Sequence, residues 1–102
     1  MARIEQICKL LEKEPRDPFL NFSLGMEYQA AGQTDEALRQ FDRTIAVAPE
    51  YLPAHIRKAE LLISAHRFDD ARPVLERGAE LARVAKDQHM LDNLTHMLEM
   101  LP

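Results

Sequence analysis

The sequence contains no tryptophan, only three glycines and only six aromatic residues among its 102. Strand-rich folds use aromatic residues on their half-buried faces and glycine in their turns. The scarcity of both argues against a sheet, and the many Ala, Leu, Glu and Arg residues favour helices. A hydrophobic content of 46% in a chain of this length suits one compact domain with a modest core.

Cysteine, excess positive charge and long apolar runs are scarce as well. Cys8 is the single cysteine, which excludes a disulfide within the chain and fits a reducing compartment. The net charge is −4, and Arg and Lys are spread singly, so we expect no binding to nucleic acid. Glu5, Lys9 and Glu12 interrupt the N-terminal segment, so we expect neither a signal peptide nor a membrane span. These features predict a cytoplasmic protein that binds no membrane.

The sequence repeats itself with a period of 34 residues. Positions 34 apart carry residues of similar size or type, as in the pairs Gly25 and Ala59, Ala37 and Ala71, Phe41 and Leu75, and Pro15 and Pro49. A fixed period of this length is typical of helical repeat proteins, in which neighbouring repeats bury a continuous core.

Local signals divide each repeat into two helices. Asp17 and Pro18 suit the N-cap and first position of a helix, and Gly32 suits its C-terminal stop. The acidic pair Asp35 and Glu36 suits the start of the next helix. The same signals and offsets predict an all-α chain with six helices, near residues 2–13, 18–31, 35–47, 52–65, 69–84 and 87–100.

The flanking segments follow the same register. Residues 1–17 are predicted to form the second half of a preceding repeat, and residues 18–51 and 52–85 two full repeats. Residues 86–102 carry apolar residues at positions that form one wide helical face: Met90, Leu91, Leu94, Met97, Leu98 and Leu101. This helix is expected to close the stack, so the sequence predicts a single domain over residues 1–102.

The repeat positions resemble those of the tetratricopeptide repeat (TPR) family. The resemblance is carried by Leu24, Gly25, Tyr28, Gly32, Ala37, Phe41 and Pro49, and in the second repeat by Ala59, Leu62, Phe68, Ala71, Leu75 and Gly78. The chain departs from the family pattern at Asn21, His55, Lys58 and Arg83. The resemblance implies a TPR-like α-solenoid, a right-handed superhelix of antiparallel helix pairs whose first helices line a concave groove.

Helical geometry selects the residues expected in that groove. On the helix over 18–31, a stripe that includes Leu24 and Tyr28 holds the packing positions of the family, so the opposite stripe is predicted to face the groove. With its equivalents one and two repeats later, this stripe predicts the partner-binding residues Phe19, Phe22, Met26, Gln29, Ile56, Arg57, Glu60, Ile63 and Leu94.

The resemblance implies a protein-interaction module or scaffold and no enzymatic activity. We expect the apolar groove to bind a partner peptide or amphipathic helix. Two alternatives remain open: the apolar residues of the first helices pack against one another, or the groove or the C-terminal helix forms a homodimer interface.

Three other kinds of site are not expected. A known TPR subgroup clamps a peptide carboxylate with several donors, but only Arg57 is suitable among the corresponding residues, Phe22, Met26, Arg57, Asp87 and Leu91. His89, Asp92 and His96 share a helix face without further metal ligands, so we expect no metal and no cofactor. Cys8 has no base near it in sequence, so it is not expected to be catalytic.

Overall fold

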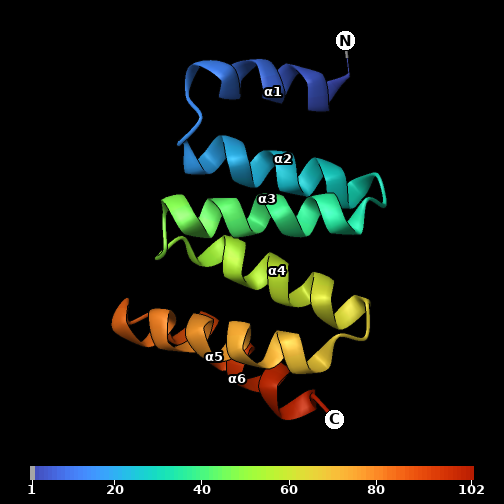
Figure 1. Cartoon of the computed structure of the whole chain (residues 1–102). Helices are drawn as coiled ribbons and strands as arrows, with labels where there is room; N and C mark the ends of the chain where they lie inside the picture. Colours follow the sequence, from blue (N-terminus) through green and yellow to red (C-terminus); the bar gives the residue numbers. More distant parts are fainter. Residues whose placement is uncertain (1) are drawn as a thin grey trace. The chain divides into compact units, whose positions relative to one another are not determined.

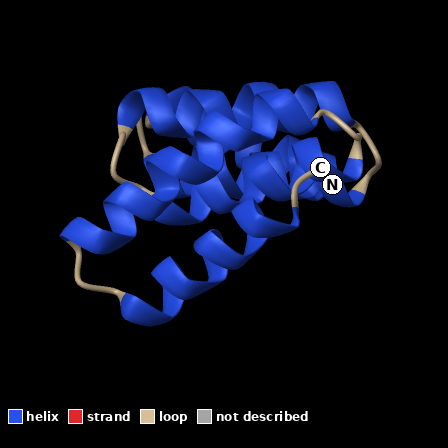
Figure 2. Cartoon of the chain, turned by 90° about the horizontal axis from the view of Figure 1, so that it is seen from below, coloured by secondary structure: helices blue, strands red, loops and turns tan. Residues whose placement is uncertain are grey.

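The chain is entirely helical in the computed structural model, which describes residues 2–102. Met1, where the predicted first half-repeat begins, lies outside the described residues. The helices are α1 (Arg3–Lys13), α2 (Pro18–Ala30), α3 (Thr34–Val47), α4 (Leu52–Ser64), α5 (Phe68–Val84) and α6 (Gln88–Met100) (Figures 1 and 2). Residues 2–102 contain no strand. The predicted all-α fold is confirmed, and every predicted helix end lies within one residue of the observed one.

The chain divides into two compact units. The N-terminal unit ends at Ala54 and holds α1, α2, α3 and the first residues of α4. The C-terminal unit runs over His55–Pro102 and holds the rest of α4 with α5 and α6. The repeat boundaries drawn from the sequence, and the single domain, remain predictions.

Three helices end in the same backbone turn. Gly32 after α2, His66 after α4 and Lys86 after α5 all have positive φ, at 76°, 59° and 59°. The amide of the next residue bonds to a carbonyl five residues back in each case, as from Gln33 N to Tyr28 O at 2.9 Å and from Asp87 N to Ala82 O at 2.9 Å. This bond satisfies carbonyls that the helix end would leave unpaired. The turn therefore reverses the chain tightly between consecutive helices.

The contact between α2 and α3 depends on a missing side chain. The Phe41 ring is fully buried and lies against the backbone of Gly25. A Cβ atom at Gly25 would stand 2.6 Å from Cε1 of Phe41, well inside van der Waals contact. Gly25 therefore lies at a close contact between two helices, and Ala59, the residue one repeat later, is fully buried as well.

A buried apolar residue and three polar contacts hold α1, and the turn that follows it, to α2. Ile7 is 5% exposed, and Arg3 Nε lies 3.3 Å from a carboxylate oxygen of Glu27 on α2. Asn21 donates from Nδ2 to the carbonyls of Pro15 and Asp17, at 3.1 and 2.9 Å. Asn21 stands where the family often has a large side chain, and here it is buried and holds the turn between α1 and α2 in place.

We expect Gly25→Ala to lower the free energy of unfolding by about 1–3 kcal/mol. Alanine favours a helix interior over glycine by about 1 kcal/mol, so a loss would isolate the clash with Phe41. Combining it with Phe41→Leu, which shortens the ring side chain, should cost less than the sum of the two single changes. Urea denaturation of the four proteins measures this coupling. Strict additivity would show that the two residues do not constrain each other.

We expect Lys86→Gly to raise the free energy of unfolding by about 0.5–1 kcal/mol, because glycine adopts positive φ without steric cost. His66→Gly should stabilise the protein less, because it removes the edge contact between the His66 and Phe68 rings, whose centroids are 5.7 Å apart. Gly32→Ala, the reverse change in the equivalent turn, should be destabilising. Thermal melts rank the three variants. A lower melting temperature for Lys86→Gly than for the wild-type protein would show that the positive φ of Lys86 does not cost stability.

Candidate functional site

The candidate site is one side of α2, made of Phe19, Phe22, Met26 and Gln29, which we call the α2 outer face. These residues lie opposite the buried Leu24 around the helix. The Phe19 side chain is 65% exposed, and the other three residues are half-buried. The α2 outer face carries no charge, since Glu27 is the one charged residue within Pro18–Ala30.

Phe22 is both part of the surface and part of the packing beneath it. Its ring centroid lies 5.8 Å from that of the buried Phe41 and 5.4 Å from that of Tyr51, the latter in an edge-on arrangement. Aromatic pairs in such geometries stabilise each other beyond the area that they bury. Phe22 is therefore held in place, while Phe19 has no ring partner among the described residues. Tyr51 lies between α3 and α4, outside the helical stripes, so no spacing in the sequence signals it.

The predicted residues of the second repeat lie together on α4. Ile56 and Ile63 are half-buried, and Arg57 and Glu60 are exposed. They correspond by the 34-residue offset to positions on or beside the α2 outer face. This part of the predicted surface belongs to the C-terminal unit and, unlike the α2 outer face, carries charge of both signs.

The prediction that Leu94 binds a partner is wrong, because its side chain is 1% exposed. The exposed side of α6 carries polar residues such as Asp92, Asn93 and His96, and its apolar side packs with α5. Leu94 lies at the centre of that apolar side and is buried by the hydrophobic effect. On α6 the 34-residue offset therefore selects the buried side of the helix.

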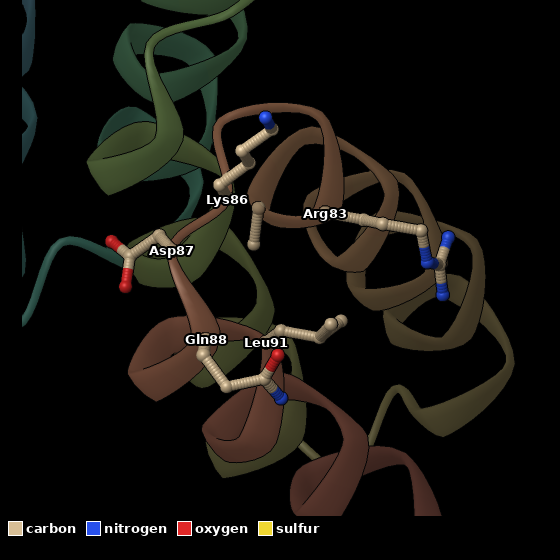
Figure 3. Close-up of a pocket in the computed structure, with 6 residues that line it drawn as sticks. Arg83, Lys86, Asp87, Gln88 and Leu91 are labelled. Atoms are coloured by element: carbon tan, nitrogen blue, oxygen red, sulfur yellow. The ribbon is translucent and has the colours of Figure 1, made fainter.

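A cavity of about 190 Å³ lies at the turn between α5 and α6, beside Arg83, Lys86, Gln88 and Leu91 (Figure 3). Arg83 pairs with Glu80, and Asp87 caps α6 by accepting from Met90 N at 3.1 Å. Gln88 donates from Nε2 to Asp92 at 2.7 Å. Figure 3 shows the Arg83 and Lys86 side chains pointing in different directions, so their two positive charges do not face a common point in the cavity.

Within residues 2–102, no group of three His, Cys, Asp or Glu side chains is placed to hold a metal ion. His89, Asp92 and His96 therefore do not form a site together with further ligands. Each of the three is exposed on α6.

None of the described helices is both long enough and apolar enough to cross a membrane.

Comparison with known proteins identifies the repeat. The tetratricopeptide repeat family model matches residues 28–91. A comparison with curated protein sequences found no match. Among solved structures, a tetratricopeptide repeat domain protein from Salinibacter ruber is 27% identical with a TM-score of 0.76, over 82% of this chain and 85% of that one.

Two structures that contain bound partners show the same fold at lower identity. The complex of the TPR2B domain of yeast Sti1 with pHsp70 is 14% identical with a TM-score of 0.85, over 94% of this chain and 77% of that one. PcrH in complex with the chaperone-binding region of PopD is 18% identical with a TM-score of 0.85, over 94% and 73%. The family match covers more than half of the residues and agrees with the observed helices and their turns. The chain belongs to the tetratricopeptide repeat family.

Proposed function

We propose that this protein is a non-catalytic interaction module that binds an apolar segment of a partner protein on the α2 outer face. Phe19 supplies the main exposed contact, and Phe22, Met26 and Gln29 complete the surface. The single observation that carries the proposal is an exposed phenylalanine on a helix face without charge. The single cysteine fits action in the reducing cytoplasm.

The composition of α2 supports this proposal. Where a helix in contact with its neighbours meets water, it normally carries charged residues. On the side of α2 that lies opposite the buried Leu24, Phe19 and Met26 stand instead. Covering an apolar surface with another apolar surface releases about 25 cal/mol for each Å² removed from water. Methionine also adapts to irregular partners, because its side chain is flexible and polarizable.

The structural neighbours support the class of partner. One neighbour is a complex with pHsp70 and another a complex with the chaperone-binding region of PopD. The same fold therefore presents a surface for segments of other proteins in those cases. For this chain we propose an apolar peptide or an amphipathic helix as the partner segment, which such modules bind through anchor side chains.

We propose that the four α4 residues form a separate and more polar contact surface of the C-terminal unit. Arg57 and Glu60 are exposed there and stand at the equivalents of Ser23 and Met26. Exposed charges steer a partner and set its register more than they add affinity. The apolar anchor is therefore assigned to α2 alone, and contacts at the α4 surface are proposed to depend on charge.

Self-association through α6 is not proposed. The apolar residues of α6 are buried or half-buried, and the exposed side of the helix is polar except for Met100. One exposed apolar side chain is far less than a stable dimer interface requires.

We expect Phe19→Ala to weaken binding of an apolar peptide by about 10- to 100-fold, because an exposed aromatic anchor contributes much of the affinity of such a contact. Peptides obtained from a random display library on the wild-type protein serve as probes, and isothermal titration measures their affinity. Because Phe19 is largely exposed, the free energy of unfolding should change by less than about 0.5 kcal/mol.

Two control variants separate binding from folding. Leu10→Ala removes a side chain that is 53% exposed on α1, outside the α2 outer face, and should leave peptide binding unchanged. Phe22→Ala should lower the free energy of unfolding by about 2–4 kcal/mol, because it removes the contacts with Phe41 and Tyr51. Equal affinities for wild-type protein and Phe19→Ala would contradict the proposed function.

A further inference from the structure

We infer that Tyr51 is a specificity-determining residue of the partner-binding surface, and that its hydroxyl group hydrogen-bonds to an acceptor on the partner beside the apolar anchor. The inference rests on the proposed function, because it assumes that a partner covers the α2 outer face. It adds a residue that neither the helical periodicity nor the repeat offset identifies.

The first reason is position. The Tyr51 ring stands edge-on to the Phe22 ring, with centroids 5.4 Å apart and an interplanar angle of 66°. Phe22 is one of the four residues of the α2 outer face, so Tyr51 borders that face. Both residues belong to the N-terminal unit.

The second reason is the state of the hydroxyl group. In the described part of the chain the Tyr51 hydroxyl makes no hydrogen bond. It is also not one of the buried polar atoms that lack a partner, which are Asn21 Oδ1 and Gln40 Oε1. Tyr51 as a whole is half-buried, and because its unpaired hydroxyl is not among the fully buried atoms, that group keeps some access to solvent. This side chain therefore offers a polar group at the edge of a surface that is otherwise largely apolar.

The third reason is that the backbone holds Tyr51 in a fixed position. Its amide donates to Ala48 O at 2.9 Å, and its carbonyl accepts from Ala54 N at 3.1 Å. Both backbone polar groups of Tyr51 are thus satisfied, one by the C-cap residue of α3 and the other by the first turn of α4. The main chain at Tyr51 is therefore fixed, and the contact with the Phe22 ring restrains its side chain. A restrained side chain loses little conformational freedom on binding, which favours a specific contact.

These observations define the partner chemistry that the surface prefers. A partner that covers Phe19 and Phe22 also removes water from the Tyr51 hydroxyl. A segment with a neutral acceptor there replaces the lost hydrogen bond with water, whereas a purely hydrocarbon segment leaves the hydroxyl unpaired, which is unfavourable. The preferred partner is therefore an apolar anchor with a hydrogen-bond acceptor next to it, supplied by a main-chain carbonyl or a side-chain amide.

The test compares wild-type protein with Tyr51→Phe, which keeps the ring and its contact with Phe22 and removes only the hydroxyl. Peptides from a random display library selected on the wild-type protein are the probes, and titration calorimetry gives their affinities. We expect Tyr51→Phe to weaken these peptides by roughly 5- to 10-fold. Peptides selected on Tyr51→Phe should bind the wild-type protein less tightly than they bind the variant.

Two series of altered peptides identify the acceptor. Replacing each side chain by alanine tests a side-chain amide, and replacing each main-chain amide by an ester weakens one carbonyl acceptor at a time. In one of the two series, we expect a single replacement to produce a peptide that binds wild-type protein and Tyr51→Phe with the same affinity. That non-additivity is the signature of a direct contact.

The outcomes separate the inference from the proposed function. If Phe19→Ala weakens the selected peptides and Tyr51→Phe changes their affinity by less than 2-fold, the inference is wrong and the proposed function stands. If neither variant changes the affinity, both are wrong. Matching thermal melts of Tyr51→Phe and wild-type protein would show that a loss of affinity does not come from misfolding.

Discussion

The close approach of the Phe41 ring to the backbone of Gly25 sets the spacing of α2 and α3. Because the ring occupies the volume that a side chain would need, α2 lies directly on α3. The same ring also packs against the Phe22 ring and so supports part of the α2 outer face. The repeat has a small residue at position 25, and this lets the Phe41 ring approach α2. The same ring supports Phe22, so this one contact also shapes the candidate binding surface.

Much of the fold is predictable because its signals are local. Asp17 caps α2 by accepting from Leu20 N at 3.0 Å, and Pro18 and Gly32 bound that helix as their backbone preferences dictate. Such preferences act within a few residues and need no knowledge of the rest of the chain. His66 and Lys86 show the limit of this reasoning, because they occupy the turn conformation that Gly32 adopts without strain. His66 stands one repeat offset after Gly32, whereas Lys86 does not, so at Lys86 the surrounding helices alone decide the conformation.

The site was only partly predictable, for two physical reasons. The helical stripe placed Phe19 and Phe22 on one face of α2. The 34-residue offset predicts the corresponding face of α6 only if α6 is packed in the same way as α2 and α4. The apolar residues of α6 gather on one side, which is buried, so Leu94 lies inside. Tyr51 was missed because no helical period applies to a linker. Its contact with Phe22 exists only in three dimensions, and no spacing in the sequence signals it.

The distribution of charge shows why α2 differs from the other helices. The exposed sides of α3 and α5 carry ion pairs three residues apart, Arg39 with Glu36 and Arg83 with Glu80. Exposed pairs of this kind add little stability, but they keep the surface hydrated and discourage association. The outer side of α2 has no such pair, although a lysine or glutamate at Phe19 would cost the fold almost nothing at an exposed position. Since folding does not require an aromatic residue there, its presence is better explained by a contact made outside the chain.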